Sequence, residues 1–330
     1  MEERKMITNQ TFDEERALYG SRNADVSYCR FEGLADGESA LKESKDVAVR
    51  NCFFALRYPF WHNTALAIEH CELTETCRAA LWYDKDVAIS HCKLHGIKAM
   101  RESGAVSISD CDVVSAEFGW NCTDIALERV TLTGDAAFMG CKGLSMSHCS
   151  AVSPRFGWNC TDVTLNDCDL QSEYFLFGCK NVRMNGTTFK GKYSFQYVKN
   201  MELHDCVLDT KDAFWHTENV TVYDSVIKGE YLAWYSKNLR LVRCTIEGTQ
   251  PLCYCDGLVL EDCTMKNCDL AFEYCTVEAT VHGHIDSVKN PIHGSITADS
   301  IGEIILDENQ KPESDCVITD LSGTSKGEQA

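Results

Sequence analysis

The chain is poor in positive charge and has no long apolar run. Its 330 residues include 31 Lys and Arg against 50 Asp and Glu, which gives a formal net charge of −19. A nucleic-acid-binding surface needs a basic stripe, and an anionic membrane repels an acidic protein, so the charge disfavours both partners. No stretch approaches the roughly 18 apolar residues of a membrane-spanning helix. Residues 1–20 hold no apolar signal-peptide core, so we expect a cytoplasmic protein.

One short phrase recurs along most of the sequence. Residues 219–225 read Asn-Val-Thr-Val-Tyr-Asp-Ser, and residues 200–206 and 238–244 are variants of the same phrase. We call its final position the cysteine column. The column falls every 19 residues at Cys92, Cys111, Val130, Cys149, Cys168, Thr187, Cys206, Ser225, Cys244 and Cys263, and earlier at Cys29, Cys52 and Cys71. A fixed period of this length indicates a solenoid.

The pattern inside each repeat predicts strands and tight bends. Apolar residues lie five and three positions before the cysteine column, as Val87 and Ile89 do, which is typical of a strand with one buried face. Asp or Asn lies six positions before the column, as at Asp86 and Asn219, and tolerates a left-handed backbone at a bend. No helix signals separate the repeats. Three short strands per 19 residues predict an all-β fold, a right-handed parallel β-helix.

We expect one β-helix domain over residues 1–310, with about thirteen 19-residue coils in residues 21–265. Residues 11–14 (Thr-Phe-Asp-Glu) resemble a capping box, so residues 1–20 are predicted to form a short helical cap on the first coil. The repeat decays after Met265, and residues 266–310 are predicted to form the C-terminal cap. Residues 311–330 are predicted to be a loose tail.

The 20 cysteines, in a chain without an export signal, are expected to be free thiols. A second column, eight residues before the first, contains Cys122, Cys141, Cys160, Cys179 and Cys255. Zinc needs four ligands in a tetrahedron about 2.3 Å from the metal, whereas cysteines at one coil position lie in a line. We therefore predict no metal and no cofactor, and interpret the cysteines as small apolar filler of a narrow core.

A third strand in each coil is apolar or aromatic on both faces. Successive strand residues face opposite sides, and a narrow core cannot hold both rows, so one row is expected to face outward as a stripe. The first row includes Phe60, Phe195 and Phe214. The second includes Trp61, Trp82, Trp215 and Trp234. The third is polar and aromatic, with His62, Tyr83, Tyr197, His216, Tyr235 and Tyr254.

The stripe favours a binding module for carbohydrate, because flat rings stack on sugars while hydroxyl and imidazole groups form hydrogen bonds. Two alternatives stay open: the third row lines the core, or the stripe is the interface of a self-associating structural protein, a homodimer without a small-molecule ligand. The predicted ligand-binding residues are Trp61, Trp82, Tyr83, Tyr197, Trp215, His216, Trp234, Tyr235 and Tyr254.

A carbohydrate-active enzyme, either a hydrolase or a lyase, is a further alternative. The sequence contains no Asp-Asp pair and no Gly-His-Gly. His62, Arg101 and Glu102 belong to nearby coils and are candidates for an acid–base cluster, and His216 is another candidate catalytic residue.

Several long phrases resemble one bacterial family of unknown function that is placed with the pectin-lyase-like parallel β-helices. They include residues 11–20 (Thr-Phe-Asp-Glu-Glu-Arg-Ala-Leu-Tyr-Gly), 57–61 (Arg-Tyr-Pro-Phe-Trp), 211–216 (Lys-Asp-Ala-Phe-Trp-His) and 229–235 (Gly-Glu-Tyr-Leu-Ala-Trp-Tyr). The resemblance extends from Met6 to about Glu308. It implies the fold and supplies no activity, since fold-level analogy is poor evidence for function.

Overall fold

The structure, a computed structural model, describes residues 3–323. It is an all-β parallel β-solenoid of about 17 turns, with coils of about 19 residues and no α-helix in this range. The predicted fold class is therefore confirmed. Contacts divide the chain into two compact units, Met1–Asp169 and Leu170–Ala330, which are described in turn. None of the described residues forms a helix that is long and apolar enough to cross a membrane.

In unit 1 a complete coil has three strands. The first side is formed by β3 (Arg22–Ser27), β5 (Lys45–Arg50), β8 (Thr64–Glu69), β11 (Lys85–Ser90), β14 (Gly104–Ser109), β17 (Thr123–Glu128), β20 (Lys142–Ser147) and β23 (Thr161–Asn166). The second side is formed by β4 (Arg30–Phe31), β6 (Phe53–Phe54), β9 (Glu72–Leu73), β12 (Lys93–His95), β15 (Asp112–Val114), β18 (Thr131–Thr133) and β21 (Ser150–Val152). The third side is formed by β7 (Phe60–Trp61), β10 (Leu81–Trp82), β13 (Met100–Arg101), β16 (Glu117–Phe118), β19 (Ala136–Ala137) and β22 (Arg155–Phe156). A 3₁₀ turn, η1 (Glu75–Cys77), lies between β9 and β10.

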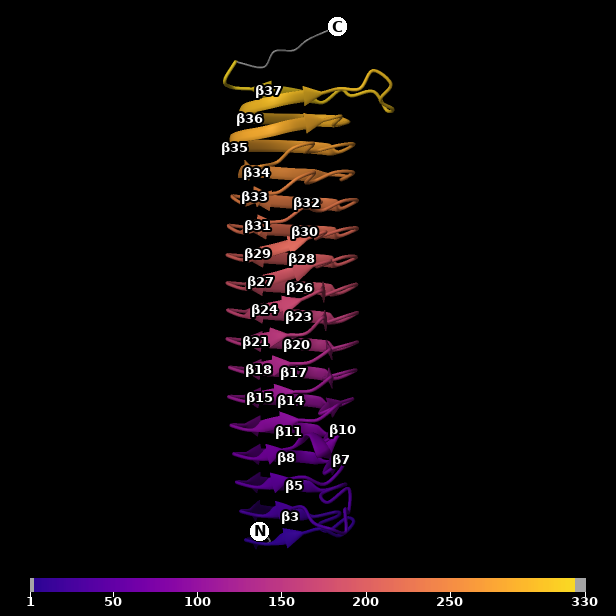
Figure 1. Ribbon diagram of the computed structural model, residues 1–330, viewed down its shortest axis with the longest axis vertical. Coiled ribbons are helices and arrows are strands. Elements are labelled where there is room, and N and C mark those ends of the chain that lie inside the picture. The colour runs from indigo at the N-terminus through magenta and orange to yellow at the C-terminus, as the bar shows by residue number, and fades with distance from the viewer. Residues whose placement is uncertain (1–2, 324–330) are drawn as a thin grey trace. The chain divides into compact units, whose positions relative to one another are not determined.

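Successive coils pair in parallel, each residue opposite its equivalent in the next repeat. Val87 pairs with Val106 and Ile89 pairs with Ile108, and all four side chains are buried. Figure 1 shows β5, β8, β11 and β14 one above another. The apolar pairs predicted from the sequence are therefore the inward face of the first side.

The N-terminal segment is itself a coil, so the prediction of a helical cap was wrong. β1 (Lys5–Thr8) pairs in parallel with β3, and β2 (Thr11–Phe12) pairs with β4. Ile7 is buried, and the Phe12 ring stacks on Phe31 with the ring centroids 5.2 Å apart. The free edges of β3 and β4 offer backbone partners to this segment, and these outweigh the weak helix signal of residues 11–14.

Unit 2 continues the pattern through longer strands. They are β25 (Tyr174–Phe175), β26 (Lys180–Asn185), β27 (Thr188–Lys192), β28 (Lys199–His204), β29 (Val207–Lys211), β30 (Glu218–Tyr223), β31 (Val226–Lys228), β32 (Lys237–Val242), β33 (Thr245–Glu247), β34 (Leu258–Lys266), β35 (Thr276–Lys289), β36 (His293–Ile305) and β37 (Val317–Asp320); β24 (Asp169–Ser172) spans the boundary in sequence.

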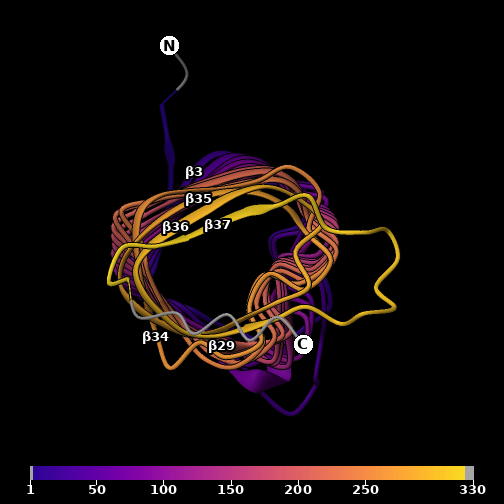
Figure 2. The ribbon, with the colours of Figure 1, turned by 90° about the horizontal axis from the view of Figure 1, so that it is seen from above.

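The C-terminal region adds further turns. β35 pairs in parallel with β34, and β36 pairs with β35. Figure 2 shows β35, β36 and β37 over one another, with the segment between β36 and β37 extending away from the coil. Residues 317–320, expected in a loose tail, instead form a strand on β36; residues 324–330 of that tail lie outside the described range. The N-terminal coil and these C-terminal turns add to the thirteen coils predicted for residues 21–265 and bring the total to about 17 turns.

The Asp and Asn bends are as predicted. Asp86 has φ 54° and Asn219 has φ 58°, both in the left-handed region. In unit 2 the Asn side chains also bond from coil to coil. Nδ2 of Asn200 donates to Oδ1 of Asn181 at 3.2 Å, and Nδ2 of Asn238 donates to Oδ1 of Asn219 at 3.0 Å.

The cysteine column is more than apolar filler. All of its cysteines are buried free thiols, and thiols of the column also form hydrogen bonds. The Cys52 N–H donates to Sγ of Cys71 at 3.4 Å, and Sγ of Cys71 donates to the Glu69 carbonyl at 3.2 Å. Ser225 forms the same two bonds, with the Cys206 N–H and the Tyr223 carbonyl. At most of its positions the column therefore holds a small side chain that both accepts and donates, and Val130 is an exception.

This role predicts different outcomes for two small substitutions. Cys71→Ser keeps a donor and acceptor, whereas Cys71→Val leaves the buried Cys52 N–H without its partner, which costs about 1–3 kcal/mol. Both side chains fit the column, since Ser225 and Val130 occupy it in other coils. We expect the Val variant to unfold at lower urea concentration than the Ser variant. Equal urea midpoints for the two variants would show that only the volume of this side chain, and not its hydrogen bonds, contributes to stability.

Candidate functional site

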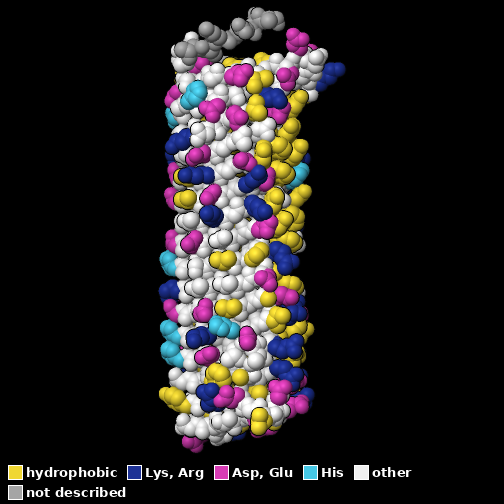
Figure 3. Space-filling model, viewed as in Figure 1, with side chains coloured by type: hydrophobic (Ala, Val, Ile, Leu, Met, Phe, Trp, Pro, Cys, Tyr) yellow, Lys and Arg dark blue, Asp and Glu magenta, His cyan; other side chains and the backbone are white. Residues whose placement is uncertain are grey.

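The third side of the coil carries three rows of side chains with different exposure. The first row, which includes Phe60, Phe195 and Phe214, is buried in the core. The tryptophan row is half-buried. The third row faces solvent, with Tyr197 48% and Tyr235 45% exposed, so the alternative that this row lines the core is wrong. In the space-filling view hydrophobic side chains gather along the right edge, where β7 and β10 lie in Figure 1 (Figure 3).

In unit 2 the third row forms a continuous stack of rings, here named the tyrosine–histidine ladder: Tyr197, His216, Tyr235, Tyr254 and Tyr274. Successive ring centroids lie 4.9, 5.0, 4.9 and 5.9 Å apart, and the planes of neighbours differ by 11°, 8°, 13° and 11°. The ring faces therefore cover one another, and Tyr197, His216 and Tyr235 are exposed while Tyr254 and Tyr274 are half-buried.

Tyr274 was not among the residues predicted from the sequence. It follows Tyr254 by 20 positions, because the coil that contains it departs from the 19-residue period. The usable signal was the second cysteine column: Cys275 follows Tyr274 as Cys255 follows Tyr254, and the Cys255 N–H donates to Sγ of Cys275 at 3.1 Å.

The ladder side chains lie on a backbone that L-residues rarely adopt. Tyr197, His216 and Tyr235 have φ of 60°, 56° and 61°. Gly178, at the equivalent place in the preceding coil, has φ 67° and no Cβ to strain. A large side chain at a left-handed position destabilises the fold relative to Gly or Asn. Contacts along the ladder, or contacts with something outside it, must offset this cost.

The tryptophan row packs against the side of the ladder. Nε1 of Trp215 donates to the Tyr231 carbonyl at 2.6 Å, and Nε1 of Trp234 donates to the Gln250 carbonyl at 2.9 Å. The two indoles stack with centroids 5.4 Å apart, and Trp234 contacts the Tyr254 ring edge to face. The polar atoms of these two predicted ligand-binding residues are thus already bonded within the coil.

Unit 1 carries a shorter group of the same kind. His62 stacks on Tyr83 with centroids 4.8 Å apart, and Trp61 contacts Trp82 edge to face at 5.3 Å. The next residue in the tryptophan row is Arg101.

The Arg101 guanidinium lies over the rings of Trp82 and Trp120, at 5.2 and 4.7 Å from their centroids. Its Nη1 also donates to Glu117 at 3.2 Å. Arg101 is therefore engaged in packing. His216 lies within the ladder between two tyrosines. Catalysis by His62, Arg101, Glu102 or His216 stays a prediction.

Three lysines near the ladder are paired with glutamates, whereas Lys237 forms no ion pair among the described residues. Lys199 lies 2.6 Å from Glu218, Lys211 lies 2.7 Å from Glu230, and Lys192 lies 2.8 Å from Glu173. These exposed pairs add little stability.

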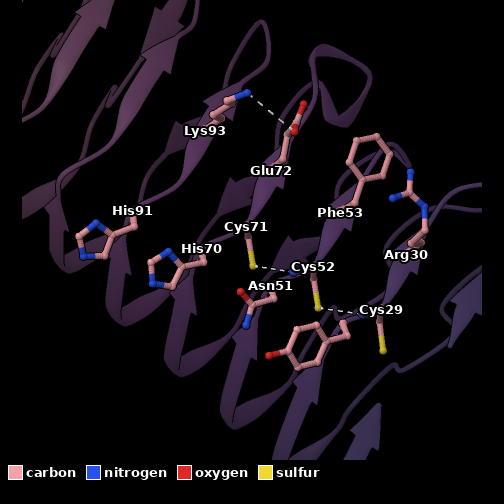
Figure 4. A pocket seen from close by; sticks show the side chains of 11 residues that line it. Cys29, Arg30, Asn51, Cys52, Phe53, His70, Cys71, Glu72, His91 and Lys93 are labelled. Atoms are coloured by element: carbon pink, nitrogen blue, oxygen red, sulfur yellow. Dashed lines mark hydrogen bonds and ion pairs between the residues drawn. The ribbon is translucent and has the colours of Figure 1, made fainter. Parts of the chain in front are cut away.

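A shallow groove of about 590 Å³ lies on another side of unit 1 and was not predicted from the sequence. Figure 4 shows His70 and His91 side by side at its edge, and Lys93 directed toward Glu72. The imidazoles stack with centroids 4.8 Å apart. The sequence did contain a pattern that could have indicated this pair: both histidines lie at the position just before the cysteine column. Within residues 3–323, no group of three or more His, Cys, Asp or Glu is arranged to hold a metal ion.

The fold and the exposed rings define a parallel β-solenoid with an aromatic surface. The chain belongs to a family described as "Protein of unknown function (DUF3737)", whose model matches residues 5–154 and 141–319. The family resemblance expected from the sequence is thus confirmed. No curated protein matches the chain at a significant level.

Solved structures with a similar chain path share little sequence with this protein. A PL6 alginate lyase in complex with trisaccharide is 7% identical, with 97% of this chain and 94% of that chain covered and a TM-score of 0.47. The tailspike of E. coli bacteriophage HK620, in complex with hexasaccharide, is 9% identical, with coverage of 96% and 71% and a TM-score of 0.35. The A-module of mannuronan C-5 epimerase AlgE4 from Azotobacter vinelandii is 9% identical, with coverage of 85% and 91% and a TM-score of 0.30. These values are too low to transfer a substrate or a site.

The ladder contains one phenol with a raised pKa. Burial, followed by the negative charge of Glu273, raises the pKa of Tyr254 to about 12. The Tyr254 hydroxyl donates to Oε2 of Glu273 at 3.2 Å, and Lys289 lies 2.8 Å from the same carboxylate.

Glu273→Gln should therefore lower the pKa of Tyr254, because it removes a negative charge that opposes the phenolate. The pKa should stay above the ordinary tyrosine value of about 10, since burial is the larger cause. Phenolate absorbance during a pH titration measures this, with Tyr254→Phe identifying the signal. An unchanged pKa in the Gln variant would contradict the assigned contact.

Proposed function

We propose that the tyrosine–histidine ladder is a binding surface for a neutral, hydroxyl-rich carbohydrate chain. The observation that supports this most directly is the even spacing of its ring centroids, 4.9–5.0 Å from Tyr197 to Tyr254. A carbohydrate chain lying along the coil axis meets a similar polar group at each turn of the protein.

Binding in this mode relies on hydrogen bonds more than on stacking. The sequence suggested that sugars would stack on the rings, but neighbouring rings cover each other's faces within the ladder. A phenol hydroxyl donates one hydrogen bond and accepts others, and a neutral imidazole donates through one nitrogen and accepts through the other. Sugar hydroxyls have the same dual capacity. The ring edges supply apolar contact between these polar groups.

The charge around the ladder favours a neutral ligand. Two of the neighbouring lysines are paired with glutamates, Lys199 with Glu218 and Lys211 with Glu230. The net charge of −19 further disfavours a polyanionic glycan. An acidic oligosaccharide would have to compete for paired lysines or approach an acidic protein without compensation.

The test is a calorimetric titration of the whole chain with a panel of neutral and acidic oligosaccharides. We expect saturable binding of a neutral oligosaccharide. In Tyr235→Ala the affinity should fall about tenfold or more, because one exposed ring and its hydroxyl are lost. Tyr28→Ala is the matched control: Tyr28 is exposed and also has a left-handed backbone, but it lies outside the ladder. Its affinity should equal that of the unchanged protein.

Two results would overturn the proposal. One is binding that survives Tyr235→Ala and His216→Ala equally well. The other is a flat response across the panel together with a concentration-dependent dimer, seen by sedimentation, that Tyr235→Ala dissociates. That second outcome would assign the ladder to self-association, for which exposed aromatic side chains are equally suited.

A further inference from the structure

A second buried column runs through the corner that follows the exposed aromatic row. We name it the corner column, and in unit 1 it comprises Ser44, Asn63, Asp84, Ser103, Cys122, Cys141 and Cys160. All of these residues are buried. Several of these side chains accept the backbone N–H of the residue at the same position in the preceding coil, whereas Oγ of Ser44 and Nδ2 of Asn63 have no hydrogen-bond partner among the described residues. The Ser44 N–H donates to Oδ1 of Asn63 at 2.7 Å, and the Asp84 N–H donates to Oγ of Ser103 at 3.2 Å.

The thiols and hydroxyls of this corner also donate. Sγ of Cys141 donates to the Gly119 carbonyl at 2.7 Å, and Sγ of Cys160 donates to the Phe138 carbonyl at 2.8 Å. Ser236, at the same position in unit 2, donates to the Phe214 carbonyl at 2.8 Å. At Ser103 and Cys160 the corner therefore uses a group that accepts from one backbone atom and donates to another.

Asp84 is the carboxylate in this series. Its side chain is fully buried, and its Oδ1 accepts the Asn63 N–H at 2.7 Å. Its Oδ2 is also buried and has no hydrogen-bond partner among the described residues. An ionised carboxylate can only accept, so it cannot reproduce the donating half of the column's role.

No neighbouring charge compensates for a negative charge on Asp84. On its own segment, Tyr83, Lys85 and Asp86 are exposed. From the adjacent coils, His62 is exposed, Glu102 is half-exposed, and the Arg101 guanidinium bonds Glu117. Its neighbours in the column, Asn63 and Ser103, are uncharged. None of the ion pairs within residues 3–323 includes Asp84. Burial raises the pKa of Asp84 well above its ordinary value, and an unpaired buried carboxylate is strongly unfavourable.

We propose that Asp84 is held as a neutral carboxylic acid in the corner column, and that its ionisation at higher pH loosens the bend carrying Tyr83. Oδ1 accepts the Asn63 N–H, and protonation of the unpartnered Oδ2 removes a buried charge that no neighbouring group compensates. Tyr83 directly precedes Asp84, so a proton in the core is coupled to the position of an exposed ring. This proposal is independent of what the ladder in unit 2 binds.

The sign of the pH dependence follows from proton binding. The unfolded chain releases the Asp84 proton near its ordinary pKa of about 3.9, whereas the folded chain retains it to higher pH. Between these two pKa values the folded state binds one more proton than the unfolded state. The Asp84 contribution therefore raises the unfolding equilibrium constant up to tenfold per pH unit as the pH increases. Above the folded pKa this contribution is constant.

The experiment compares urea unfolding of the unchanged protein and Asp84→Asn from about pH 5 to about pH 9. An amide is accommodated in this column at Asn63, and it cannot ionise. We expect the ratio of the two unfolding constants to change with pH by up to tenfold per unit, with the unchanged protein losing stability relative to the variant. Asp135→Asn removes an exposed carboxylate and should show no such divergence.

A second measurement does not depend on the variant folding well. In the NMR spectrum of the protein with isotope-labelled aspartate, one carboxyl should remain protonated near neutral pH. That resonance should be absent in Asp84→Asn, or in Asp84→Ser, which copies Ser103. Parallel unfolding profiles, or an Asp84 carboxyl that titrates in the ordinary range, would overturn the proposal.

Discussion

Residue-for-residue pairing between coils is the constraint on which the rest of the structure depends. Val87 lies opposite Val106, and Met201 lies opposite Val220, without any shift of register. Because the pairing is parallel, each side chain lies beside its equivalent in the next repeat. A property of one position becomes a property of a whole row within each unit. Cysteines, asparagines and aromatic rings are thereby sorted into separate columns.

The two inward columns show how such a fold satisfies backbone groups at its bends. A bend interrupts the sheet, and a buried N–H there needs a partner. Cys71 and Ser103 supply one from a side chain. Cysteine suits the place because it is small, apolar enough for the core and able to form both bonds. The abundance of cysteine is therefore explained by hydrogen bonding as well as by volume.

Much of this architecture could be predicted from the 19-residue period alone. The period identified the inward pair Val87 and Ile89, the bend at Asp86 and the column at Cys92. It failed at the ends, where Ile7 and Phe12 keep the pattern of buried positions although the phrase itself is absent. There the exposed edge of the neighbouring coil determines the conformation, and that edge cannot be seen in a local stretch of sequence.

The sequence predicted most residues of the candidate site, but it did not predict how their rings are arranged. The row containing Tyr197 and Tyr235 could be aligned from the repeat, but its exposure depends on the bend that follows it. That the rings would cover one another also could not be predicted, because ring orientation follows from the backbone angle at each bend. The burial of Asp84 was also not predicted, because a lone Asp has no distinctive sequence pattern.

The left-handed backbone beneath the ladder affects how readily its aromatic side chains are replaced during evolution. At these positions Gly and Asn fit with less strain than Tyr or His, as Gly178 and Asn159 do. Random mutation toward Gly or Asn relieves strain there and meets little resistance from folding. A lineage that no longer used the surface would lose these rings early, while Phe195 and Cys206 beneath them would be kept by the core. A complete ladder is thus the part of the molecule that folding alone protects least.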